Sequence, residues 1–337
     1  MHTLSFTGAR QVRFPAPDVA RGFMLALIAL ANVPFWLRYF PDAPQVGEAA
    51  LAAMNDADQW WYLVRTLFVD RRAYPLFSIL FGFGMAIMAS RTIERERRFA
   101  MDAIPPELSA GWNTVQWENV RDSVERRARR AASRLIRRRG WWMLAFGLVH
   151  GIVFAGDIIG AYGLVAVIFA EVIVMRRPWL RVLVGAIIAS LSMLGIWSMA
   201  AMVGREPMVL ESHGPVVLDA SYLLVSLASW LIATPMTVLT ALVVPCVMIG
   251  VGVARWGLLQ DPRGRGPLLV GIALVGLGIG ALGAVPFALM QLDWAFVGSA
   301  AWSYPLFHAS GVAGACGWLA LLALVGGGPR ESLGSVC

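Results

Sequence analysis

The chain has 337 residues, of which 58% are hydrophobic and only 15% are charged, and its mean hydropathy is +0.66. This composition excludes an ordinary soluble domain and predicts an all-α, polytopic membrane protein, because a bilayer core about 30 Å thick is crossed by roughly 20 apolar residues in a helix. The net charge of +7 comes from arginine alone, since all 28 basic residues are arginine.

Eight apolar segments are long enough, or nearly so, to span a bilayer. The sixth is too long for one straight span, so we expect part of it to lie in the interface or to kink at Pro235 or Pro245. The eight expected spans lie near residues 18–38, 73–90, 140–156, 157–175, 180–203, 224–254, 267–291 and 303–327.

Thirteen of the arginines lie in one loop between Arg91 and Arg139. Short basic loops stay on the cytoplasmic side of a membrane, because moving each guanidinium across it costs several kcal/mol. This orientation puts both termini in the cytoplasm and 23 of the 28 arginines on the inner side. The positive charge therefore reflects topology, and a nucleic-acid partner is not expected.

The chain divides into four regions. Residues 1–90 hold two spans and an outer interfacial helix, residues 91–139 form the basic loop, residues 140–203 hold spans three to five, and residues 204–337 hold spans six to eight. Two apolar stripes at helical spacing predict helices that do not span: Val120 to Leu135 on the inner leaflet and Trp60 to Phe68 on the outer one.

Two sequence features have simpler interpretations. The first apolar run follows two arginines and contains Ala29-Leu30-Ala31, so a cleaved signal peptide is the one targeting alternative. The three cysteines, Cys246, Cys316 and Cys337, have no metal-binding or disulfide spacing, and we expect them to be small apolar fillers. No metal site is expected.

The first span carries three polar residues. Asp18 follows a proline and can cap the helix, and Arg21 can extend its guanidinium to the inner headgroups. Asn32 lies roughly 16 Å further along the helix, inside the hydrocarbon depth. It therefore needs a polar cavity or an interhelical hydrogen bond, and the sequence does not decide between them.

The strongest polar cluster surrounds His150, the only histidine besides His308 that lies well inside an expected span. Gly147 and Gly151 flank it at a spacing that lets another helix approach. On a continuous helix Asp157 would lie about 10 Å from His150, too far for a direct hydrogen bond. If the two residues act together, a substrate, a water or a side chain must therefore lie between them. Possible side chains are those of Arg21, Asn32 and Tyr162. Alternatively, His150 bonds a carbonyl of a neighbouring helix and Asp157 caps the fourth span.

Three arginines before the second span depart from the charge bias. Arg65, Arg71 and Arg72 fall on the expected outer side, with Asp70 beside them. Most such residues are solvated or form local ion pairs worth under about 1 kcal/mol. Otherwise they would recognise an anionic acceptor such as a lipid headgroup or an envelope glycan.

Three blocks of sequence resemble the YeiB-type bacterial inner-membrane proteins, a family with a domain of unknown function. The blocks are Asp18-x-x-Arg21-Gly22 through Asn32, the run Tyr74-Pro75-Leu76-Phe77-Ser78-Ile79-Leu80-Phe81-Gly82-Phe83-Gly84, and Phe146 to Tyr162. They cover most of residues 10–175. One branch has a histidine eleven residues beyond the arginine, in the pattern Arg-x10-His, where this chain has Asn32. The family continues beyond a segment like 303–327, so we expect a shortened C-terminal region here.

The family is similar in turn to transmembrane acyltransferases, which implies an acyl-CoA donor from the cytoplasm and a lipid or glycan acceptor. The roles that follow are expectations. His150 would be the general base assisted by Asp157, with Asn32 or Tyr162 donating to the thioester oxygen. Basic residues would bind the donor phosphates at the inner side, and others would bind the acceptor. Arg21, Arg137 and Arg138 would bind the phosphates of the acyl-CoA donor, with the acidic Asp18 at the same site, and Arg65, Arg71 and Arg72 would bind the acceptor.

Two other classes of function fit the same residues. A proton-coupled transporter would use His150 and Asp157 as a proton relay, although no internal repeat is visible. A non-catalytic membrane subunit would use glycine-rich faces such as Gly276-x3-Gly280 for assembly, including assembly of a homo-oligomer. Nucleotide-binding and zinc motifs are absent, which argues against an ATP-driven pump or a membrane metalloprotease.

Overall fold

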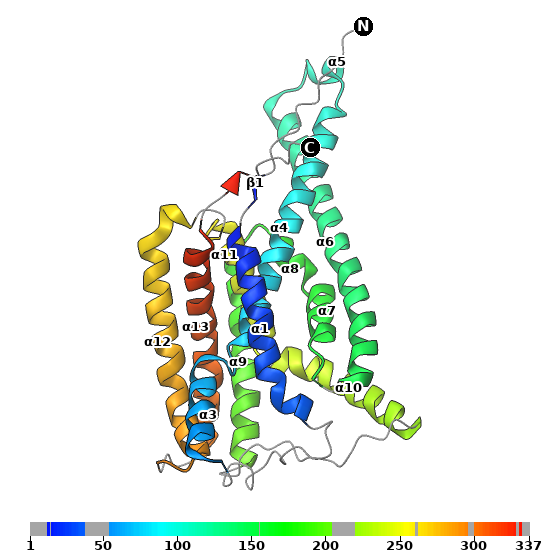
Figure 1. Ribbon diagram of the computed structural model, residues 1–337. Coiled ribbons are helices and arrows are strands. Elements are labelled where there is room, and N and C mark those ends of the chain that lie inside the picture. Colours follow the sequence, from blue (N-terminus) through cyan, green and yellow to red (C-terminus); the bar gives the residue numbers. More distant parts are fainter. Residues whose placement is uncertain are drawn as a thin grey trace, which may run out of the picture.

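The computed structural model describes residues 12–13, 15–37, 54–154, 156–203, 220–259, 262–295, 300–327 and 330–331. In these ranges the chain is a bundle of helices with one short strand pair (Figure 1). The elements are β1 (Val12–Arg13), α1 (Pro15–Leu37), α3 (Asp56–Phe68), α4 (Ala73–Asp102), α5 (Pro106–Ser109), α6 (Thr114–Val153), α7 (Ile159–Ile168), α8 (Ala170–Val174), α9 (Pro178–Val203), α10 (Ala220–Thr240), α11 (Val243–Arg255), the 3-10 turn η1 (Arg263–Arg265), α12 (Gly266–Gln291), α13 (Ala300–Gly326) and β2 (Arg330–Glu331).

The helical composition confirms the membrane-protein class. Among the described residues, five helical segments are long and apolar enough to cross a membrane. Large apolar side chains cover their outer faces, for example Leu194 on α9 and Leu274 on α12, which are 58% and 70% exposed. A lipid environment accounts for such exposure. The five segments are Asp56–Asp102, Pro178–Met202, Ser221–Thr240, Gly266–Gln291 and Ala301–Gly326.

The centre of the bundle is a close crossing of α4 and α11. A Cβ atom added to Gly82 would lie 2.1 Å from the Val247 carbonyl oxygen, and one added to Gly250 would lie 1.9 Å from the Ile79 carbonyl oxygen. Only glycine permits this backbone contact. Gly82 of the Tyr74 to Gly84 block thus has a packing role.

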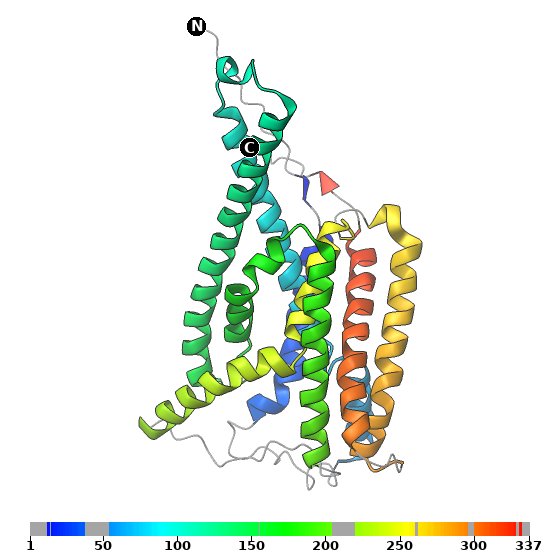
Figure 2. The same ribbon diagram turned by 180° about the vertical axis from the view of Figure 1, so that it is seen from behind.

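The sixth apolar segment is broken, as expected, although not at a proline. Pro235 lies inside α10, while the break falls at Leu242, whose φ of 57° is left-handed. Pro245 lies in the first turn of α11. Backbone N–H groups in the first turn have no hydrogen-bond partner within the helix, so a proline is tolerated there. Helix α10 crosses one end of the bundle at a steep angle to the other helices (Figures 1 and 2).

Helix α3 covers the stretch expected to form an outer interfacial helix. It packs along α12, with the Trp60 and Trp294 rings 5.1 Å apart near its start, and near its end Trp318 of α13 donates a hydrogen bond to the Phe68 carbonyl oxygen. The large side chains of its apolar stripe, Trp60, Trp61, Val64 and Phe68, remain exposed. The chain then breaks over residues 69–72 before α4 begins.

The basic loop is continuous with the third span. Helix α6 runs without a break for 40 residues and includes the stretch expected to lie on the inner leaflet. Ala128, Ala132 and Ile136 are completely buried. Together α4, α5 and α6 form a helical hairpin that projects from one end of the bundle (Figure 1). Strands β1 and β2 pair antiparallel at that same end (Figure 1).

Candidate functional site

His150 and Asp157 contact each other directly. The His150 Nδ1 and Asp157 Oδ1 atoms are 2.8 Å apart. The expected separation of about 10 Å was wrong, because it assumed a continuous helix. In the structure α6 ends at Val153, Phe154 is extended, and Asp157 precedes α7, so the chain folds back toward His150.

Asp157 is held by three further donors. Its carboxylate accepts hydrogen bonds from the Ile159 N–H at 3.1 Å, the Gly160 N–H at 2.9 Å and the Trp230 indole N–H at 2.9 Å. The first two donors are N–H groups at the start of α7 that have no partner within the helix. Asp157 therefore caps this helix and contacts His150 at the same time. The side chain is 2% exposed and is therefore fixed in place.

Glycines bring the three helices around this pair together. A Cβ atom on Gly147 would lie 2.4 Å from the Gly160 nitrogen, and one on Gly151 would lie 2.1 Å from the Trp230 ring. This confirms the predicted close approach at Gly147 and Gly151. The pair is thus set between α6, α7 and α10.

The other side of the His150 ring faces outward. Its side chain is 43% exposed, beside the exposed Phe146 and Val149, and the Phe154 ring centre lies 5.4 Å away. When Asp157 is ionised and accepts the Nδ1 hydrogen, the neutral ring presents its Nε2 lone pair. The arrangement can therefore take a proton from a group that approaches Nε2.

The structure does not bring the two expected assisting residues to His150. Tyr162 is completely buried, and its hydroxyl lies 3.0 Å from Ser78 Oγ and donates to the Tyr74 carbonyl oxygen at 3.3 Å. Asn32 lies half-buried on α1. Neither residue is among the described contacts of His150.

The expected donor residues lie elsewhere. Arg21 pairs with Asp18 at 3.1 Å on α1, Arg137 pairs with Glu171 at 3.2 Å, and Arg138 is exposed. A shallow groove of about 670 Å³ runs along α6 and is lined by Ser123, Arg126, Arg127, Arg130, Arg134, Arg137 and Glu171. At about 100° per residue, Arg134 lies about 160° around α6 from His150. The groove and the histidine therefore occupy opposite flanks of this helix.

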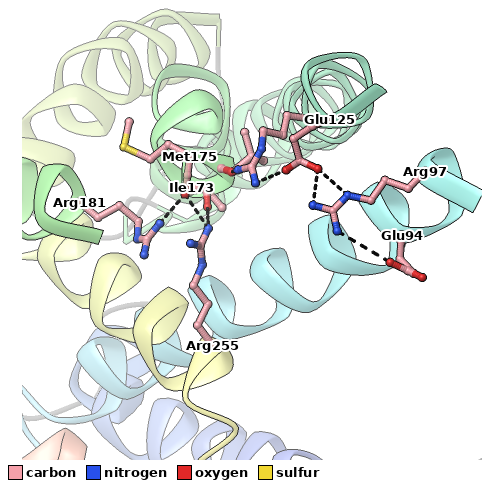
Figure 3. A network of polar contacts seen from close by, with 9 residues as sticks. Glu94, Arg97, Glu125, Ile173, Met175, Arg181 and Arg255 are labelled. Carbon is pink, nitrogen blue, oxygen red and sulfur yellow. Dashed lines mark hydrogen bonds and ion pairs between the residues drawn. The ribbon is translucent and has the colours of Figure 1, made fainter. Parts of the chain in front are cut away.

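A second arginine cluster joins four helices at the end of α8 (Figure 3). Arg181 donates to the Met175 carbonyl oxygen at 2.6 Å, and Arg255 donates to the Ile173 and Met175 carbonyl oxygens at 3.1 and 3.0 Å. Arg129 donates to the Val174 carbonyl oxygen and pairs with Glu125. These guanidinium groups satisfy the carbonyls that the helix end leaves free. The fourth span was expected to end near residue 175, which agrees with the end of α8 at Val174, but the arginines that cover this end come from other helices and were not predicted to do so.

A third cluster occupies the break between α3 and α4. Arg65 pairs with Asp70 at 3.0 Å, Arg71 donates to the Tyr304 hydroxyl at 2.8 Å, and the completely buried Arg72 donates to the carbonyl oxygens of Thr66, Asp70 and Gly280. The expectation of a solvated face was wrong for Arg72. Among the described residues, Arg65 forms the local ion pair that we expected as an alternative.

The break lies at mid-depth in the bundle. Gly280 is about 21 Å from the start of α12 and about 16 Å from its end, at 1.5 Å per residue. A Cβ atom on Gly311, near the middle of α13, would lie 2.2 Å from the Arg71 carbonyl oxygen. Sequence analysis missed Tyr304, Gly280 and Gly311 as partners, because they lie more than 200 residues away along the chain.

Comparisons of the chain with protein-family models, with curated proteins and with solved structures find no match. Within the described residues, no group of three or more His, Cys, Asp or Glu side chains is placed to hold a metal ion. The functional argument therefore depends on the geometry of the His150 pair and the arginine clusters.

Proposed function

We propose that the protein is an acyltransferase of the bacterial inner membrane, which passes an acyl group from acyl-CoA to a lipid or glycan acceptor. The observation that supports this proposal is the 2.8 Å contact of His150 with Asp157, together with the exposure of the rest of the His150 ring. A buried carboxylate that orients a histidine is a common arrangement for general-base catalysis. The likeness of three sequence blocks to the YeiB-type family agrees with it.

The chemical step assigns one role to each member of the pair. The acceptor hydroxyl gives its proton to His150 Nε2 as its oxygen attacks the thioester carbon, and the new ester forms as the thioester bond breaks. The proton then passes from His150 to the leaving CoA thiolate. Asp157 stabilises the imidazolium in between and keeps the ring in one orientation.

The proposed topology has eight spans and both termini in the cytoplasm. In this orientation the α4–α6 hairpin is cytoplasmic, as its thirteen arginines favour. His150 lies at the opposite end of α6 from the hairpin, so it would act on an acceptor toward the outer leaflet. The groove of α6 lies on the other flank, and the proposal does not depend on it.

The test is CoA release by the purified protein in nanodiscs that contain phosphatidylethanolamine, phosphatidylglycerol and an envelope-glycan extract. Acetyl-CoA and palmitoyl-CoA serve as donors, and free thiol is measured. We expect His150→Ala to lower the rate by about 100-fold or more without lowering the melting temperature, since general-base catalysis is worth that much. Val149→Ala, its exposed neighbour, is the matched control and should keep the full rate.

Two results would refute the proposal. One is thiol release by the wild type no faster than by empty nanodiscs with either donor. The other is a His150→Ala variant as active as Val149→Ala. Asp157→Asn should also lose activity, but it removes a charged acceptor from four donors, so its melting temperature must be compared.

The break between α3 and α4 favours a second candidate, a proton-coupled transporter of an anion. Transporters place their substrate and ion sites at discontinuous helices near the bilayer midplane. In proteoliposomes this function would appear as anion-dependent proton uptake without thiol release. The glycine faces of α12 favour assembly less, because Gly276 and Gly280 already pack against α13.

A further inference from the structure

We propose that Arg71, held beside Tyr304 at the break between α3 and α4, binds an oxyanion, either a carboxylate or a phosphate, at mid-depth in the bundle. Arg71, Arg72, Arg65, Asp70 and Tyr304 form this break site. None of these residues belongs to α6, α7 or α10, so the site is separate from the His150 pair.

The charges of the break site do not balance. Three guanidinium groups meet there. Among the described residues, Asp70 is the one carboxylate that forms an ion pair with any of them. Asp70 compensates Arg65, to which it bonds at 3.0 Å. A cation without a counter-charge inside the hydrocarbon depth costs several kcal/mol, so the surplus calls for an anion.

Arg72 has a structural explanation. One terminal nitrogen donates to the carbonyl oxygens of Thr66 and Asp70, at and just after the end of α3. The other donates to the carbonyl oxygen of Gly280 on α12. The negative end of the α3 dipole also favours a cation at this place. The main-chain carbonyls therefore explain why Arg72 is placed here, and the ion pair with Asp70 explains Arg65. Arg71 has neither of these two explanations.

The backbone of Arg71 is held in an unfavourable conformation. Its φ of 60° is left-handed, a conformation that is unfavourable for a residue with a side chain. Its carbonyl oxygen lies where a side chain on Gly311 would be, so the close packing of α13 fixes the position. Strain of this kind persists where the surrounding structure enforces it, and such places are often binding sites.

The side chain of Arg71 is oriented and still has donors to offer. One terminal nitrogen donates to the Tyr304 hydroxyl at 2.8 Å, the Tyr74 hydroxyl is a second hydrogen-bond partner, and the guanidinium carbon lies 5.6 Å from the centre of the Tyr304 ring. A guanidinium has five N–H donors, and the two oxygens of a carboxylate or phosphate match its fork. Arg72 adds a buried Nε atom that has no hydrogen-bond partner.

Two sources can supply such an oxyanion: a free small anion or the phosphate of an anionic lipid. A titration of delipidated protein in neutral detergent with inorganic phosphate and with acetate, followed by calorimetry, tests the first source. Native mass spectrometry of protein released from nanodiscs of phosphatidylglycerol or of phosphatidylcholine tests the second source.

Arg71→Gln is the decisive variant, because it removes the charge and keeps a side chain of similar length. We expect it to weaken binding of the effective probe by about tenfold or more, the loss of one charge-assisted contact. Arg130→Gln, in the α6 groove, is the matched control and should bind within about twofold of the wild type, as should His150→Ala. Tyr304→Phe removes the hydroxyl that orients Arg71 and should give a smaller loss.

The proposal is upheld if wild-type protein binds at least one probe saturably and Arg71→Gln loses that binding selectively. It is overturned if the wild type binds none of the probes, if Arg71→Gln binds like the wild type, or if Arg130→Gln loses as much. Where Arg71→Gln does not fold, Tyr304→Phe decides by the same criteria. His150→Ala keeps this result distinct from the acyltransferase test, since it should abolish turnover and leave anion binding unchanged.

Discussion

The end of α3 and the end of α8 use the same solution in two environments. At each of them a helix stops inside the protein, and arginines from other segments donate to its last carbonyl oxygens. At α3 the donor, Arg72, is completely buried, and at α8 Arg181 is buried as well, whereas Arg255 is exposed and Arg129 is partly exposed. From this difference we expect that the burial of each arginine, and not the number of its hydrogen bonds, decides how much it contributes to the free energy of unfolding.

The common cause is the helix end itself. The last four carbonyls of a helix have no partner within it, and where they are buried no water can supply one. A guanidinium can reach two carbonyls at once, as Arg255 and Arg72 both do, because its donors are spread over a planar fork. A lysine offers only a point charge. This suits a chain whose basic residues are all arginine.

The largest expected effect is that of Arg72→Ala. It leaves three carbonyl oxygens without their donor, two of them at a buried helix end, and we expect the free energy of unfolding in detergent to fall by about 3 kcal/mol or more. Arg255→Ala should lower it by about 1 kcal/mol, because water can replace an exposed donor. Equal losses for the two variants would refute the importance of burial.

Gly311→Ala should come next. The new Cβ atom would lie 2.2 Å from the Arg71 carbonyl oxygen, so α13 must move, and we expect a loss of about 2 kcal/mol in the free energy of unfolding. Gly278→Ala, on α12, has nothing within 4 Å of the new atom and should be neutral or stabilising, because alanine favours helices. The measurement is the thermal unfolding of both variants under the same conditions. A Gly278→Ala variant less stable than Gly311→Ala would contradict the prediction.

The smallest effect concerns Glu125 in the hairpin. Partial burial alone would raise the pKa of its carboxyl, but hydrogen bonds from Arg97 and Arg129, with their charges, lower that pKa below its ordinary value. A lowered pKa means that the stabilisation is present at neutral pH and is lost as the pH falls through the pKa of the folded state.

The difference in melting temperature between wild type and Glu125→Gln should therefore shrink between pH 7 and roughly pH 3.5. The corresponding free energy should stay under about 1 kcal/mol, as for partly exposed ion pairs. A difference that grows on acidification would show that Glu125 is not stabilised as the carboxylate.

Local signals predicted much of the helical framework. The segments expected near 267–291 and 303–327 match α12 and α13 within a few residues, because each is a continuous apolar run bounded by polar turns. The close approach at Gly147 and Gly151 followed from small-residue spacing. The expected boundary between the third and fourth spans, at residues 156 and 157, agrees with the turn between the end of α6 at Val153 and the start of α7 at Ile159. The distance expected between His150 and Asp157 was wrong because it did not take this turn into account.

The candidate sites were predictable only in part. His150 and Asp157 were found because polar residues are expensive in an apolar segment. Their contact was missed, since it depends on a turn. Arg71 and Arg72 were noticed for their charge, but their depth depends on Tyr304 and Gly280, which only tertiary packing brings close.

The late position of those partners has a consequence for biosynthesis. Arg72 bonds a carbonyl 208 residues further along the chain, and Arg71 bonds a hydroxyl 233 residues further along. When α3 and α4 leave the ribosome, neither α12 nor α13 exists, so the two guanidinium groups have to wait at the lipid surface or in the insertion machinery. The N-terminal helices can therefore reach their final depth only after the last helix has been made. A chain that stops before α13 should be recognised by quality-control proteases at its beginning rather than at its end.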